Sequence, residues 1–192
     1  GKAFKFGDSI STDHIIPGRL LHLRSNLPEL AKHVFEDIDP AFAERVASGD
    51  FVVGGKNFGL GSSREHAPLV IKISGVSAVL VKSVARIFFR NAINVGLPVL
   101  ICDTDMIDDG DKLEVNLKTG EISDLTNKVQ LRFSKMPEVM LRILNEGGLI
   151  PYIKKYKNFD VRLMNGTYLL PSISAGIFKR KSGNSPSSCL RD

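Results

Sequence analysis

Residues 54–68 hold the densest group of side chains that could do chemistry, in the sequence GGKNFGLGSSREHAP. Four glycines in eight positions allow the backbone to adopt positive φ and to approach a ligand closely. The segment follows the apolar run FVV and precedes the apolar run LVIKI. A helix that begins after such a loop presents unsatisfied N–H groups, so the pattern predicts a seat for an anion.

The residues around Gly61 indicate which anion the seat would take. Gly61 is followed by Ser62 and Ser63 and not by lysine, so a phosphate-binding P-loop is excluded. Gly59 and Gly61 are followed by Arg64 where a dinucleotide fingerprint needs glycine, and the Gly-x-Ser-x-Gly elbow of hydrolases is also absent. Two hydroxyls and a guanidinium remain, and the planar fork of arginine suits bidentate pairing with a carboxylate.

Two other interpretations of the same segment stay open on spacing alone. The glycines could make only a tight turn, with Ser62 or Ser63 capping the helix and Arg64 lying on the surface. Glu65 and His66 could complete a Ser-His-acid hydrolase, but adjacent residues at a helix start seldom converge on one atom.

Metal ligation by this chain is not expected. Cys102 and Cys189 are far apart and lack CxxC spacing, so they cannot by themselves hold zinc or an iron-sulfur cluster. Asp13 and His14 are adjacent, point apart on most backbones and have no evident third ligand. We interpret Asp13 as a structural residue that bonds a turn or an arginine. The low cysteine content fits a reducing cytoplasm, which is the expected location.

The net charge of +5 does not indicate a nucleic-acid partner, because the excess is local. Five basic residues and one acidic residue lie from position 162 onward, which leaves a net charge of only +1 for residues 1–161. Arg86 and Arg90, one helical turn apart, could face an acidic substrate, but we expect them to be solvated. No apolar run approaches the length of a membrane span, and the first residues do not resemble a signal peptide.

The apolar pattern predicts a layered α/β domain over residues 1–161. Strands are expected at 78–82 and 98–101 around a helix at 85–95, a β-hairpin at 112–118 and 121–125, and a last amphipathic helix from Pro137 to the stop at Gly147 and Gly148. The mixture indicates an α/β layered architecture. Residues 162–192 are expected to be an atypical tail, disordered at its Ser-, Gly- and Pro-rich end.

The predicted helix at 85–95 has one apolar and one polar face. The residues expected to face inward are Ala85, Phe88, Phe89, Ala92 and Ile93, and those expected on the opposite face are Arg86, Arg90, Asn91 and Asn94.

The segment GKNFGLGSSREHAP closely resembles the signature of the swivelling domain of the aconitase superfamily, which forms a separate small subunit in isopropylmalate isomerase and its relatives. Three further stretches agree with that pattern: GDSISTDHIIPG at 7–18, ARIFFRNAINVGLPVL at 85–100, and the hairpin entry GDKLEV at 110–115. Together they cover residues 4 to about 160 in the family's order. The resemblance implies a swivelling β/β/α domain and leaves little room for the turn-and-cap interpretation.

Carried over residue by residue, the resemblance implies that Ser62 is the catalytic base and that Ser63 and Arg64 bind substrate. Gly59 and Gly61 would shape the anion-seat loop. It further implies that a small di- or tricarboxylate binds at a four-iron four-sulfur cluster held by three cysteines of a larger partner subunit. The open iron of that cluster would act as the Lewis acid for the hydroxyl.

A second loop is expected to control substrate selectivity. The sequence LHLRSNL at 21–27 looks similar to an aconitase loop whose arginine binds a substrate carboxylate, which makes Arg24 the candidate. The match is one residue shorter between Asp13 and Arg24, and isopropylmalate isomerases usually have a different, Tyr-Leu-led sequence here. Leu20, Leu21 and Leu23 supply apolar surface suited to an alkyl group, and a merely solvated loop arginine is the alternative for Arg24.

The resulting expectation is a hydro-lyase small subunit that isomerises or dehydrates a 2-substituted malate, with 3-isopropylmalate as first choice. Alternatives are a 2,3-dimethylmalate dehydratase and a homoaconitase-type or methylaconitate-type small subunit. A ligand-binding module without activity would not need Ser62. An RNA-binding relative would need a broad basic surface, which residues 1–161 do not supply.

Overall fold

The computed structural model describes residues 1–157, and the predicted tail at 162–192 lies outside the described residues. A parallel sheet has the strand order β1-β2-β3-β4, and a separate antiparallel sheet has the order β5-β6-β7. The parallel strands are β1 (Ala3–Lys5), β2 (Phe51–Gly54), β3 (Ala78–Val81) and β4 (Val99–Ile101). The antiparallel strands are β5 (Leu113–Asn116), β6 (Glu121–Asp124) and β7 (Val129–Arg132).

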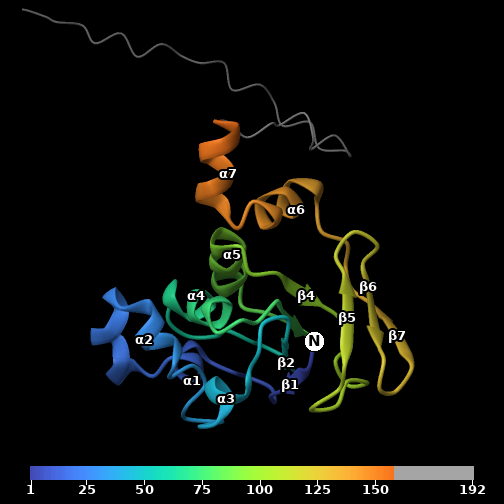
Figure 1. Cartoon of the computed structure of the whole chain (residues 1–192), viewed down its shortest axis with the longest axis horizontal. Helices are drawn as coiled ribbons and strands as arrows, with labels where there is room; N and C mark the ends of the chain where they lie inside the picture. Colours follow the sequence, from blue (N-terminus) through green and yellow to red (C-terminus); the bar gives the residue numbers. More distant parts are fainter. Residues whose placement is uncertain (158–192) are drawn as a thin grey trace, which may run out of the picture.

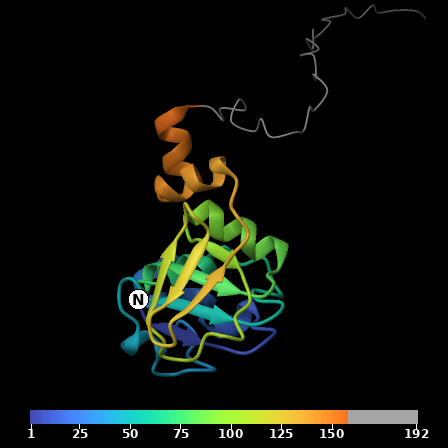
Figure 2. The ribbon, with the colours of Figure 1, turned by 90° about the vertical axis from the view of Figure 1, so that its right-hand side faces the viewer.

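The parallel sheet separates a helix layer from the antiparallel sheet (Figure 1, Figure 2). Because successive parallel strands are neighbours and their crossovers are right-handed, the connecting helices gather on one face. The other face would expose apolar side chains, and the antiparallel sheet covers it. The layers are therefore β, β and α, which confirms the predicted fold class.

Alternation along the central strands divides the core into two halves. Val52, Val79 and Val99 align across the sheet and pack in the helix-side cluster. Val53 and Leu80, the next residues along their strands, pack in the cluster on the antiparallel side with Leu113 and Ile122. Successive side chains of a strand point to opposite faces, so strands buried on both faces are apolar throughout.

Three α-helices of four or five residues and one 3-10 helix of eight residues precede β2, and four α-helices of eight to ten residues follow it. The first set is α1 (Thr12–Ile15), the 3-10 helix η1 (Gly18–Ser25), α2 (Leu27–Ala31) and α3 (Phe42–Arg45). The second set is α4 (His66–Ile73), α5 (Arg86–Val95), α6 (Glu138–Asn145) and α7 (Leu149–Tyr156). No helix within residues 1–157 is both long and apolar enough to cross a membrane.

Most predicted elements are confirmed, with three corrections. The strand, helix and strand at β3, α5 and β4, the hairpin of β5 and β6, and the start of α6 after Pro137 all match the prediction. A third antiparallel strand, β7, was not predicted, and α7 follows the glycine pair, so α6 is not the last helix. Asn91, predicted on the polar face of α5, is only 3% exposed, because that side of the helix is covered by the loop described below.

Candidate functional site

The glycine-rich loop leaves the carboxyl end of β2, the edge at which parallel α/β sheets usually bind ligands. The backbone N–H of Gly59 donates to the carbonyl of Ile10 at 2.7 Å, and Phe58 N–H donates to the carbonyl of Ser83 at 3.0 Å. Gly59 has φ +75°, and a Cβ there would lie 2.3 Å from Cγ of Phe88. Only glycine fits this position, which explains the predicted need for Gly59.

The carbonyls of the two candidate serines are held from inside the protein. The Thr12 hydroxyl donates to the carbonyl of Ser62 at 3.1 Å, and the side-chain amide of Asn91 donates to the carbonyl of Ser63 at 3.5 Å. Both serines are exposed, and neither hydroxyl has a hydrogen-bond partner within residues 1–157. The fold therefore anchors the backbone and leaves both hydroxyls open to solvent.

Neither serine caps a helix. The N-cap of α4 is Glu65, and no side-chain hydrogen bond is made there. The alternative in which Ser62 or Ser63 serves only as a helix cap is therefore wrong. A Ser-His-acid arrangement is not seen either, since no hydrogen bond joins His66 to a serine in the described chain.

Arg64 is held in place and is not a surface arginine. Its side chain is 15% exposed, and Nη1 lies 2.6 Å from Oδ1 of Asp13. The same Nη1 donates to the carbonyl of Ile16 at 2.8 Å. Its Nε and Nη2 have no partner among the described residues, so these donors remain available to a ligand.

Asp13 reaches Arg64 because its own segment is tied to the loop. The N–H of Thr12 donates to the carbonyl of Leu60 at 2.8 Å. The Ser11 hydroxyl accepts from the N–H of His14, while the His14 ring accepts from the N–H of Ser11, each at 3.1 Å. This capping box occupies His14 and orients α1, so the interpretation of Asp13 as a residue that pairs with arginine agrees with the structure.

The residues predicted to control selectivity lie on η1 and divide into two kinds. Leu20 and Leu23 are half-buried and pack against the helix-side core. Leu21 is half-buried outside that core cluster, and Arg24 is exposed with no ion pair within the described residues. The leucines that pack inward are less available to a ligand than Leu21 and Arg24.

Metal-binding groups are absent from the part of the chain that the structure describes: no three His, Cys, Asp or Glu side chains lie close enough to hold an ion. Cys102 is buried, and burial together with the nearby Asp103 raises the pKa of its thiol to about 12. A thiol with such a pKa stays protonated at neutral pH and is a poor ligand. Cys189 lies outside the described residues.

Thr12 and Asn91 hold the candidate serine loop, and sequence reasoning did not predict this for either residue. Each is almost completely buried, at 2% and 3% exposure, and each holds a serine carbonyl. Buried polar groups of this kind are normally hydrogen-bonded, but the partner of each lies far along the chain. Helical periodicity correctly grouped Asn91 with the polar residues of α5, but it could not show that a loop covers this side of the helix.

The chain is similar to proteins of known class over nearly all of its described length. A family description named Aconitase C-terminal domain matches residues 34–103. "3-Isopropylmalate dehydratase small subunit 2" of Archaeoglobus fulgidus is 64% identical over 161 residues, covering 84% of this chain and 98% of that protein. "3-Isopropylmalate dehydratase small subunit 1" of Thermotoga maritima is 56% identical over 160 residues, covering 83% of this chain and 96% of that protein.

A solved structure agrees with these sequence matches. The crystal structure of 3-isopropylmalate dehydratase from Methanocaldococcus jannaschii aligns with a TM-score of 0.79 and 46% identity, covering 82% of this chain and 93% of that chain. Fold, motif order and coverage thus agree. The chain belongs to the family of 3-isopropylmalate dehydratase small subunits, which carries the aconitase C-terminal domain.

Proposed function

We propose that this chain is the small subunit of a heterodimeric hydro-lyase that isomerises a 2-substituted malate, with 3-isopropylmalate as the preferred substrate. The observation that carries the proposal is the open pair of hydroxyls on Ser62 and Ser63 beside Arg64, whose guanidinium is already oriented by Asp13. Relatives at 64% and 56% identity are named as small subunits of 3-isopropylmalate dehydratase.

In this proposal Ser62 removes the proton next to a substrate carboxylate. A serine hydroxyl is a poor base unless its alkoxide is stabilised, so positive charge and N–H donors must lie near it. Arg64 supplies the charge, and its free Nε and Nη2 suit one carboxylate in a bidentate pair. Ser63 adds a hydroxyl contact to the same group.

The chain supplies the base and the carboxylate contacts but not the electrophile. A four-iron four-sulfur cluster in the large subunit would, when bound, supply the Lewis acid for the departing hydroxyl. The described residues offer no set of ligands for such a cluster, and the exposed seat leaves room for a partner to bring one. Closure by that partner would exclude water from the seat and strengthen the contacts of Arg64.

Substrate selectivity is assigned to η1. Leu21 provides apolar surface for an alkyl group, and Arg24 provides a charge for a further carboxylate. A relative from Methanocaldococcus jannaschii, 52% identical over 157 residues, is named "Isopropylmalate/citramalate isomerase small subunit". Citramalate is therefore the second substrate to test.

The experiment is reconstitution under anaerobic conditions. The purified chain is mixed with a large subunit from the same genome that carries three cluster cysteines, and turnover of 3-isopropylmalate, citramalate and 2,3-dimethylmalate is compared. We expect the isolated chain to be colourless and inactive and the mixture to be active, fastest with 3-isopropylmalate. An iron-sulfur absorption band in the isolated chain, or an assembled complex inactive on all three acids, would contradict the proposal.

A further inference from the structure

The arginines of the described chain differ in whether they have a carboxylate partner. The paired ones are Arg19, Arg45, Arg64, Arg132 and Arg142. Arg24, Arg86 and Arg90 have no ion pair or side-chain hydrogen bond within residues 1–157. Two of these three lie on the first two turns of α5.

The first two turns of α5 lie directly beside the loop that carries Ser62 and Ser63, which we call the serine loop. Phe88 contacts Gly59 so closely that a Cβ at Gly59 would clash with it, and Asn91 holds the carbonyl of Ser63. Ile87 is one helical turn from Asn91, so it lies on the side of α5 that faces the rim of the loop. An exposed surface of α5 is therefore continuous with the candidate site.

That surface combines one apolar side chain with two unpaired charges. Arg86 and Arg90 are exposed, and Ile87, which shares their face, is 44% exposed. Residues 82–95 contain no aspartate or glutamate, so the two arginines meet no acid on their own element. Like charges one turn apart weaken a helix slightly, and here no acid on the same helix compensates for that cost.

We propose that Arg86, Ile87 and Arg90 form a docking surface for a carboxylate-rich edge of the large subunit. This inference rests on the proposed function, because a seat completed by a partner requires contact around its rim. An apolar residue next to arginines is typical of the energetically important part of protein interfaces. Guanidinium groups that lose water there need carboxylate partners, and the described chain supplies none. Both arginines are exposed in the isolated chain, as the sequence predicted, and the proposal gives them a partner in the assembled enzyme.

The test compares two charge-reversed small subunits in the reconstituted enzyme. The Arg86→Glu/Arg90→Glu variant removes the surface, and Lys128→Glu/Arg132→Glu makes the same change in net charge on exposed residues at β7. Subunit affinity is measured by titration at two salt concentrations, and kcat and KM are measured with saturating small subunit. Circular dichroism melts establish that both variants are folded.

We expect Arg86→Glu/Arg90→Glu to raise the subunit Kd by about 30-fold or more and to reduce its salt dependence, with kcat at saturation within about threefold of wild type. The β7 variant should change Kd by less than about threefold. An unchanged Kd in the α5 variant would overturn the docking surface. A raised KM with unchanged Kd would also overturn it, and would assign the arginines to the substrate. If the wild-type chain itself does not associate, the proposed function fails, so the two failures are distinguishable.

Discussion

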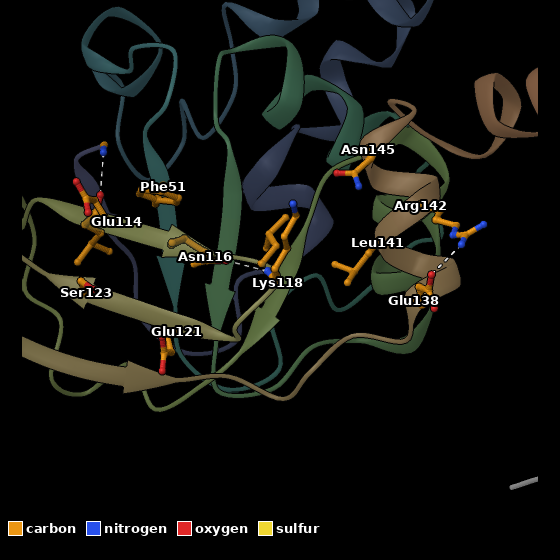
Figure 3. Close-up of a pocket in the computed structure, with 14 residues that line it drawn as sticks. Phe51, Glu114, Asn116, Lys118, Glu121, Ser123, Glu138, Leu141, Arg142 and Asn145 are labelled. Carbon is orange, nitrogen blue, oxygen red and sulfur yellow. Dashed lines mark hydrogen bonds and ion pairs between the residues drawn. The ribbon is translucent and has the colours of Figure 1, made fainter. Parts of the chain in front are cut away.

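The serine loop and the cavity beside β5 show how differently two parts of one small domain can be prepared for binding. The cavity, of about 860 Å³, is lined by residues of β5 and the turn after it, of β6 and of α6, together with Gly1 and Phe51, and includes none of residues 54–64 (Figure 3). Several of its polar groups are already engaged: Arg142 donates to Glu138 at 2.8 Å, and the Asn116 side chain accepts from the N–H of Lys118 at 3.0 Å.

The serine loop is the opposite case, since it is exposed but its side chains are already oriented for contact with a ligand. Within residues 1–157, the carbonyls of Ser62 and Ser63 are hydrogen-bonded while their hydroxyls have no partner, and one nitrogen of the Arg64 guanidinium group is bonded while the other two are not. Pre-oriented groups without partners are what a ligand can use, whereas a cavity whose polar groups bond to one another offers less. In this chain the presence of a cavity is therefore a poorer indication of the functional site than polar groups that are oriented but lack hydrogen-bond partners among the described residues. This is expected for a site that a second subunit completes.

The largest contrast is expected from serine substitutions in the two regions. Ser62→Ala should lower kcat of the reconstituted enzyme by about two to four decades, the range for losing a positioned general base, and leave subunit affinity unchanged. Ser123→Ala, in the cavity lining, should leave kcat unchanged. Steady-state kinetics at saturating large subunit measure both. Wild-type kcat in Ser62→Ala would remove Ser62 from the mechanism.

Arginine replacements sharpen the same contrast. Arg64→Lys should lower kcat/KM by about 30-fold to 300-fold, because a point charge cannot make a bidentate pair with the substrate while also holding Asp13 and the Ile16 carbonyl. Arg142→Lys, in the cavity, should have wild-type kinetics. Equal effects of the two substitutions would show that Arg64 has no special contact with substrate.

Two glycine substitutions distinguish the cost of a steric clash at the serine loop from the cost of a left-handed backbone alone. Gly59→Ala should lower the free energy of unfolding by about 2 to 4 kcal/mol, from the left-handed backbone together with the clash against Phe88. Gly147→Ala has a similar φ of +84° with nothing within 4 Å of the added Cβ, so only the backbone cost of about 1 to 2 kcal/mol is expected. Urea denaturation measures both, and equal losses would mean that Phe88 moves aside freely.

The charge on η1 is tested with two alkyl-substituted diacids. Arg24→Ala should weaken binding of 3-isopropylmalate by about 1.5 to 3 kcal/mol if Arg24 binds a carboxylate. The loss should be similar for 2,3-dimethylmalate, because both acids carry two carboxylates and differ only in their alkyl groups. The measurement is kcat/KM for both acids in wild-type and variant complexes. An unchanged kcat/KM for both acids would remove Arg24 from the site and assign selectivity to the leucines of this helix instead.

The smallest effect is expected from loosening Arg64 without removing it. Asp13→Asn should raise KM by about fivefold to tenfold, because Nη1 of Arg64 keeps its hydrogen bond to the Ile16 carbonyl but loses the ion pair. The substitution should lower the free energy of unfolding by at most about 1 kcal/mol, since Asp13 is largely exposed. Glu138→Gln, which breaks the Arg142 pair at the cavity, serves as control and should leave KM unchanged. An unaltered KM in Asp13→Asn would mean that Arg64 is held well enough without Asp13.

Local patterns predicted the secondary structure well where each element carries its own periodicity. Alternation predicted the hairpin of β5 and β6, and spacing of three and four predicted α5 and α6. The third strand, β7, reads VQLR and is followed by Phe133, so the alternation of Val129, Leu131 and Phe133 was a signal that the prediction overlooked. The helix α7 was missed because the preceding glycine pair was interpreted only as a stop.

The sequence by itself determined the layered fold, the glycine loop and the residue types of an anion seat, because each depends on patterns within a few consecutive residues. Only the tertiary structure decided how those residues are held. Asp13 and Arg64 are 51 positions apart, and Asn91 is 28 positions from Ser63, so no local pattern records either contact. The inward turn of Leu20 and Leu23 was likewise decided by packing against the core. Such contacts arise because the central sheet brings the ends of its strands to one edge, where separate loops meet.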